Sequence, residues 1–167
     1  MRIKITETKV YTWEELTDEQ KEKALSKLYD LNTDYEWWQN VYEDAEQVGI
    51  KITSFDLGRY VEGDLLLSAE EMAVNIIKDH GEQCETFKTA QKFLDDQNDD
   101  PMPDEQDDDF GAWEDRMLDL ENEFRRSILE DYLTMLQKEY EYLSSEEAII
   151  GTIKANEYEF DENGNIA

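Results

Sequence analysis

The sequence predicts an α+β fold in which a small antiparallel three-stranded sheet is packed by helices and followed by an acidic linker and a long C-terminal helix. Short segments at residues 2–12, 50–57 and 60–67 alternate apolar with polar side chains, which is typical of strands with one solvated face. Other segments repeat apolar residues every three or four positions, as helices do. Residues 95–109 hold nine acids and no base, which favours an exposed linker.

The first strand is predicted where Ile3 and Ile5 alternate with polar side chains. Thr17 and Gln20 then have the spacing of a capping box, in which side chain and backbone satisfy one another at a helix start. Apolar residues at helical spacing follow. We therefore expect a helix over residues 18–30.

A second helix is predicted from about Asn32 to Gly49, since glycine suits the left-handed position that ends many helices. The alternating segments 50–57 and 60–67 can pair as a hairpin. Because each has one apolar face, we expect the first two helices to cover the sheet.

Two further helices are expected before the linker. Ser68 and Glu71 form another capping box, which opens a helix that Gly81 should end, and residues 82–94 continue with helical spacing. The acidic residues 95–109, which include both prolines, repel one another and are expected to be exposed.

Beyond the linker, helical spacing predicts one helix of about thirty residues ending near Leu143. Ser144 and Glu147 cap a short last helix, and Asn163-Gly164 predicts a terminal turn. The predicted division is an α+β domain over 1–94, a linker over 95–109, and a C-terminal part over 110–167 packed on the first.

Charge is the dominant compositional feature, with 44 acids against 16 bases and a net charge of -28. Nineteen aromatic residues exclude a purely disordered polyanion. No apolar run reaches the length of a membrane span, and the first residues lack a signal peptide. The absence of a basic patch disfavours direct nucleic-acid binding, so we expect a basic protein partner and no membrane partner.

The acid is unevenly distributed, because residues 1–94 have a net charge of -9 and residues 95–167 have -19. Folding does not require this excess, since self-repulsion destabilises the compact state. We therefore predict that acidic residues of the linker and the long helix contact a basic partner. These residues are Asp104, Glu105, Asp107, Asp108, Asp109, Glu114, Asp115 and Asp119.

Catalytic and metal sites are not expected. His80 and Cys84, the single histidine and cysteine, are four residues apart, but Gly81 between them interrupts a helix and no third group is placed by spacing. Lone Cys84 also excludes a disulfide framework. No phosphate-binding glycine loop is present, and we predict no cofactor.

Aromatic residues offer a second candidate binding surface. Trp37 and Trp38 are adjacent, and neighbouring helix positions point about 100° apart. One of them is therefore expected in the core, and the other, with Tyr42, at a seam or on a partner's surface.

Short motifs, most of them with acidic or aromatic residues, are spread along most of the chain. They are Lys21-Glu-Lys-Ala, Asp34-Tyr-Glu-Trp-Trp, Val41-Tyr-Glu-Asp-Ala, Gly49-Ile-Lys-Ile, Phe55-Asp-Leu, His80-Gly-Glu-Gln-Cys-Glu-Thr-Phe, Glu139-Tyr-Glu-Tyr-Leu and Ala155-Asn-Glu-Tyr-Glu-Phe. These motifs resemble small acidic phage and prophage proteins of largely uncharacterised function, some of them labelled antitoxin-like. The resemblance implies a viral origin and a bacterial host cytoplasm, and it implies no catalytic residue.

Together these features predict a phage-encoded acidic inhibitor of a basic, nucleic-acid-binding host defence protein, of the anti-CRISPR or anti-restriction type. Spread evenly over about 8,600 Å², the net charge gives roughly one per 310 Å², against about one per 110 Å² for DNA. Mimicry of DNA therefore needs acids to converge on one face. The alternatives are an antitoxin-like or regulatory binding module without DNA mimicry, and a virion or assembly component. The long helix is also a candidate surface for homo-oligomerisation.

Overall fold

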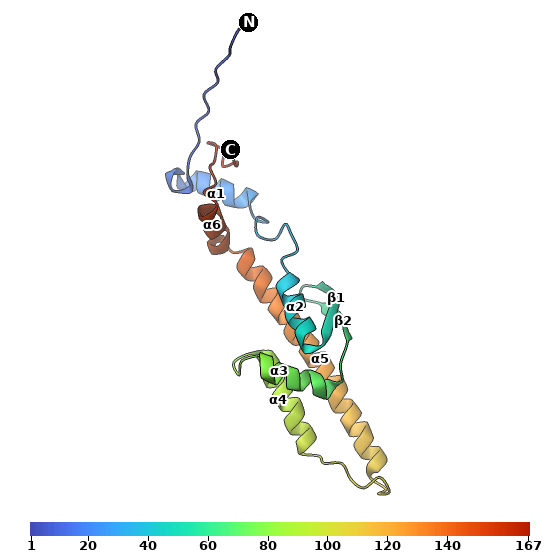
Figure 1. Cartoon of the computed structure of the whole chain (residues 1–167). Coiled ribbons are helices and arrows are strands. Elements are labelled where there is room, and N and C mark those ends of the chain that lie inside the picture. Colours follow the sequence, from blue (N-terminus) through green and yellow to red (C-terminus); the bar gives the residue numbers. More distant parts are fainter. The chain divides into compact units, whose positions relative to one another are not determined.

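The computed structural model describes all 167 residues, and tertiary contacts group them into two compact units. Unit 1 comprises Met1–Trp37 with Glu139–Ala167, and unit 2 comprises Trp38–Lys138. The sequence-based division at the linker stays a prediction. The elements (Figure 1) are η1 (Trp13–Glu15), α1 (Asp18–Lys27), α2 (Gln39–Val48), β1 (Ile50–Asp56), β2 (Tyr60–Leu65), α3 (Ala69–Asp79), α4 (Glu85–Asn98), α5 (Phe110–Leu143) and α6 (Glu146–Ala155).

The predicted three-stranded sheet is wrong, because the sheet has two strands, β1 and β2. Residues 1–10 form neither helix nor strand, and Ile3 and Ile5 are exposed. Pairing begins only at Tyr11, which exchanges two backbone hydrogen bonds of 2.8 Å with Phe160. Alternation predicts an extended conformation, but a strand also needs a partner, and the chain folds without placing one beside this segment.

The hairpin of unit 2 confirms the two other predicted strands. β1 and β2 pair antiparallel, with a register shift between Ile52 and Ser54. Ile50, Ile52 and Val61 are buried, and α2 contacts β1. Gly49, with φ of 105°, ends α2 in the left-handed conformation, as predicted from glycine's freedom to adopt it.

Three α-helices begin at a side-chain cap, whereas α2 and α4 have none. The capping boxes at Thr17 and Ser68 are both formed. The cap of α6 lies one residue later than predicted, since Ser145 accepts the Ala148 N–H. α4 includes residues 95–98 of the predicted linker, where a Lys92–Asp96 ion pair of 2.6 Å joins positions i and i+4.

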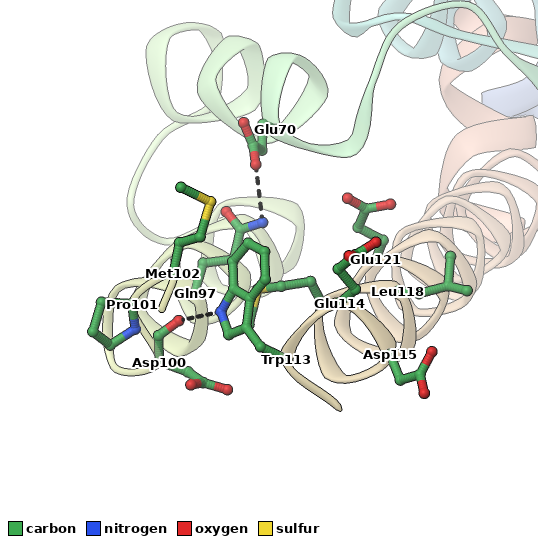
Figure 2. A pocket seen from close by; sticks show the side chains of 11 residues that line it. Glu70, Gln97, Asp100, Pro101, Met102, Trp113, Glu114, Asp115, Leu118 and Glu121 are labelled. Atoms are coloured by element: carbon green, nitrogen blue, oxygen red, sulfur yellow. Dashed lines mark hydrogen bonds between the residues drawn. The ribbon is translucent and has the colours of Figure 1, made fainter. Parts of the chain in front are cut away.

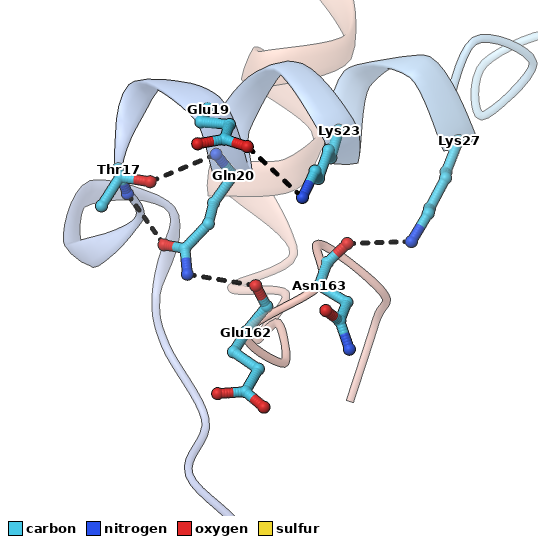
Figure 3. Close-up of polar contacts among 7 residues, drawn as sticks. All are labelled: Thr17, Glu19, Gln20, Lys23, Lys27, Glu162 and Asn163. Carbon is cyan, nitrogen blue, oxygen red and sulfur yellow. Dashed lines mark hydrogen bonds and ion pairs between the residues drawn. The ribbon is translucent and has the colours of Figure 1, made fainter.

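The core of unit 1 is built from both ends of the chain. Its buried residues are Trp13, Leu16, Ala24, Ile149, Ile153 and Phe160. The predicted terminal turn rests against α1: Gln20 Nε2 donates to Glu162 O at 3.1 Å, and Lys27 Nζ donates to Asn163 O at 2.8 Å (Figure 3). Gly164 has φ of 79°, and a Cβ there would lie 2.9 Å from Ala24 N. Only glycine fits this approach.

The predicted long helix is present as α5. Its buried stripe is Phe124, Ile128, Tyr132 and Leu136, and the Phe93 ring of α4 stacks on Phe124 at a centroid distance of 4.6 Å. The helices α3 and α4 pack on one another. No helix in the structure is long and apolar enough to cross a bilayer.

Candidate functional site

An open groove of about 570 Å³ lies in unit 2 among residues of α3, α4, α5 and the linker. We call it the acidic groove. Its apolar lining is Pro101, Met102, Trp113, Met117 and Leu118. Its polar lining is Glu70, Gln97, Asp100, Glu114, Asp115 and Glu121. Five carboxylates and no Lys or Arg line the acidic groove, so it suits a basic ligand with an apolar part.

Asp100 holds one wall of the groove in place. Its carboxylate accepts two hydrogen bonds from Arg116, at 2.6 and 3.1 Å, and its backbone carbonyl accepts the Trp113 Nε1–H at 2.8 Å. The Arg116 hydrogen bond holds the pKa of Asp100 below its ordinary value. Arg116 therefore compensates the charge of this carboxylate within the chain, and the backbone carbonyl of Asp100 fixes the Trp113 indole ring as part of the groove's apolar surface.

Three other carboxylates of the groove have no partner. Glu114, Asp115 and Glu121 project from α5 (Figure 2), and none forms a hydrogen bond or an ion pair. Glu70 across the groove accepts a hydrogen bond from Gln97 Nε2 at 3.2 Å. Unpaired carboxylates beside an apolar surface attract cationic side chains, so they are the groups of this groove with free binding capacity.

A second group of polar side chains, the polar cluster, consists of Asp44, His80, Thr86 and Tyr132. Asp44 Oδ2 lies 3.2 Å from His80 Nε2 and accepts the Tyr132 hydroxyl at 2.9 Å. His80 Nδ1 lies 2.6 Å from Thr86 Oγ1. Since a carboxylate only accepts, the proton between Asp44 and His80 belongs to Nε2, and the protonation of the ring sets the direction of the hydrogen bond between Nδ1 and the Thr86 hydroxyl. The hydrogen bond from His80 lowers the pKa of Asp44.

The polar cluster resembles an acid–histidine–hydroxyl relay, but its geometry favours a structural role. Thr86 is 3% exposed, and its hydroxyl is already hydrogen-bonded to His80. A cavity of about 290 Å³ is lined by Asp44, His80 and Thr86 of the cluster together with Cys84 and Asp131, and burial raises the pKa of Asp131. The structure gathers no group of three His, Cys, Asp or Glu side chains suited to a metal ion.

The acidic residues predicted as binding groups divide between two places. Asp104, Glu105, Asp107, Asp108 and Asp109 lie exposed in the linker, outside the groove. Asp104 and Asp107 accept hydrogen bonds from the backbone two residues onward, and acids before α5 complement the positive end of its helix dipole. Part of the linker's acidity therefore stabilises the turn and the start of α5.

On α5 itself the structure separates the three predicted acids. Glu114 and Asp115 line the groove, but Asp119 does not. Sequence reasoning missed Glu70 and Glu121. Glu121 lies seven residues after Glu114, which is two helical turns on the same face, and this spacing was the signal that could have identified it.

The aromatic residues do not form one exposed surface. Trp37 is 8% exposed and its ring lies 5.5 Å from that of Tyr140, centroid to centroid, in unit 1. Trp38 and Tyr42, in unit 2, each meet the Phe55 ring edge to face. A partner-binding role for Trp38 and Tyr42 stays a prediction.

Comparisons with protein-family models, with curated proteins and with solved structures found no match.

Proposed function

We propose that this protein is a non-catalytic inhibitor that binds a basic protein through the acidic groove and occupies its nucleic-acid-binding surface. The partner class that we propose is a host defence protein, with phage origin and the bacterial cytoplasm following from the motif resemblance. The observation that carries the proposal is the groove itself. Its apolar lining residues, which we call the floor, lie beside three unpaired carboxylates, and no Lys or Arg lines it.

Electrostatics support a basic partner. The linker's exposed acids continue the negative charge of the groove along the chain, and a surface of one sign steers an oppositely charged partner and accelerates association. Apolar contact supplies the affinity that surface ion pairs alone lack, since exposed pairs contribute roughly 0–1 kcal/mol each. Trp113 and Leu118 are candidate anchors for that contact, because both line the groove.

The test is affinity capture from a bacterium that carries defence systems, with the full-length protein as bait and captured proteins identified by mass. The groove variant is Glu114→Gln, Asp115→Asn and Glu121→Gln in one chain. The matched control is Asp119→Asn, Glu123→Gln and Glu130→Gln, which removes three exposed charges from the same helix outside the groove.

A partner that fits the proposal binds the parent and the control, is lost with the groove variant, and is displaced by duplex DNA. Its purified complex should weaken as salt rises, because salt screens exposed charges beyond about 10 Å at 0.1 M. Equal capture by groove variant and control would contradict binding at the groove. A captured partner that DNA does not displace would contradict occupation of a nucleic-acid-binding surface and favour the antitoxin-like alternative.

A further inference from the structure

The N-terminal segment, residues 1–10, exposes apolar side chains that no part of the chain covers. Ile3 is 82% exposed and Ile5 is 83% exposed. No residue of the segment forms a hydrogen bond or an ion pair within the chain. Isolated exposed apolar residues are common, but Ile3 and Ile5 are alternate residues of an extended segment, and extended peptides bind through alternate side chains that enter pockets.

The charge of this segment is opposite to that of the protein. Arg2, Lys4 and Lys9 are opposed by Glu7 alone, in a chain of net charge -28. The acidic groove offers the complementary charges, since Glu114, Asp115 and Glu121 have no partner of their own.

The spacing of the apolar side chains also matches. In an extended chain, Ile3 and Ile5 lie on one face about 6.6 Å apart. On α5, Trp113 and Met117 of the groove floor are four residues apart, which is about 6 Å along the helix axis. Both isoleucines can therefore contact the floor at once. Arg2 and Lys4 alternate with them on the opposite face of the extended chain, and their long side chains reach the carboxylates.

We infer that the N-terminal segment of one copy docks in the acidic groove of a second copy, with Ile3 and Ile5 on the apolar floor and Arg2 and Lys4 at the carboxylates. Both surfaces have exposed apolar side chains, Ile3 in the segment and Leu118, which is 52% exposed, in the groove. When each copy docks its segment in the groove of the other, both surfaces are covered in both copies and a closed two-fold dimer results. The inference rests on the part of the proposed function that makes the groove a binding surface for basic segments.

Such a dimer would regulate access of a partner to the groove. The segment competes with any basic partner for the same carboxylates, so self-association masks the groove until a partner of higher affinity displaces the segment. The repulsion between two strongly acidic chains limits the strength of the dimer, which keeps the exchange reversible.

The test measures the mass of the full-length protein across a concentration series by sedimentation and native mass spectrometry. The segment variant is Ile3→Ser with Ile5→Ser, the groove pair variant is Glu114→Gln with Glu121→Gln, and the matched control is Asp119→Asn with Glu130→Gln. We expect the parent and the control to dimerise. Each of the other variants should dimerise at least about ten-fold more weakly, because two isoleucines lose their burial or the bases lose their partners.

Mixing provides the decisive measurement. The segment variant keeps an intact groove and the groove pair variant keeps an intact segment, so an equimolar mixture should form a heterodimer that neither forms alone. A monomeric parent at every concentration, undiminished dimers of both variants, or a mixture without heterodimer would each overturn the inference. If the segment docks in the groove of its own chain, the parent stays monomeric, and this result would also overturn the inference.

Failure here is distinguishable from failure of the proposed function. The segment variant retains the whole groove and should capture a basic partner at least as well as the parent. A parent that stays monomeric at every concentration but captures a basic partner overturns only the exchange, whereas heterodimer formation without any captured partner overturns only the proposed function.

Discussion

Unit 2 contains carboxylates in two opposite situations, Asp44 in the polar cluster and the acids of the acidic groove, and the difference shows how the same chemical group serves structure or binding. In the polar cluster, Asp44 lies 3.2 Å from His80 Nε2 and accepts the Tyr132 hydroxyl. In the acidic groove, Glu114 and Glu121 have no partner in the chain. A satisfied carboxylate stabilises the fold and has little capacity left for a ligand, whereas an unsatisfied one at the surface contributes little to stability and is available for binding.

The largest expected effect is the loss of the carboxylate in the polar cluster. Asp44→Ala leaves the Tyr132 hydroxyl and the His80 ring without an acceptor in a largely buried site, which costs about 2–3 kcal/mol. Urea denaturation should show a lower midpoint with an unchanged slope. A change under about 0.5 kcal/mol would contradict the structural role of the cluster.

A smaller effect is expected from Tyr132→Phe, which removes one donor to Asp44 and keeps the buried ring. The expected loss is about 1 kcal/mol, the ordinary net contribution of a hydrogen bond. Burial and the neighbouring Asp44 carboxylate both raise the pKa of Tyr132 well above its ordinary value. No tyrosinate absorbance should therefore develop from this residue before the protein unfolds in alkali, which difference spectroscopy of parent and variant can check.

The contribution of Asp44 to the stability of the fold should depend on pH. The hydrogen bond from His80 holds the pKa of Asp44 below its ordinary value in the folded state. The ionised carboxylate therefore contributes stability that is present above the unfolded-state pKa and is lost as pH falls through the folded pKa. Its side chain is 37% exposed, so water screens part of the effect. The difference in free energy of unfolding between the parent and Asp44→Asn should shrink on acidification; a constant difference would contradict this linkage.

The smallest effect on stability is expected at the groove. The triple groove variant Glu114→Gln, Asp115→Asn and Glu121→Gln should change the free energy of unfolding by less than about 0.5 kcal/mol. The sign should be stabilising, because three fewer negative charges reduce self-repulsion. Thermal unfolding at low and high salt tests this, since added salt should reduce the gain. A loss of stability comparable with that of Asp44→Ala would contradict the idea that the groove carboxylates contribute little to the stability of the fold.

The sequence alone determined the features that depend on neighbouring residues. Capping boxes at Thr17 and Ser68 specify helix starts, and the glycine at position 49 specifies a helix end. The hairpin and the long helix follow equally from short-range periodicity. The capping and helical signals succeed because their interactions join residues within about four positions of one another, and the hairpin succeeds because a short turn brings two neighbouring segments together.

The candidate site was predictable only in part. Glu114 and Asp115 were identified from charge, but charge alone could not separate them from Asp119, which lies outside the groove. The apolar floor could not be recognised, because Trp113 and Met117 have the spacing of core residues. Whether an apolar helical position is covered depends on what packs over it.

Only the tertiary structure decided which distant residues meet. The polar cluster joins Asp44 to Tyr132, and unit 1 joins Tyr11 to Phe160, across separations that no local pattern encodes. The same limit explains the error at Ile3 and Ile5, whose alternation is that of a strand. An extended segment becomes a strand only when a second backbone accepts its hydrogen bonds, and that partner is supplied by the fold of the whole chain or by another molecule.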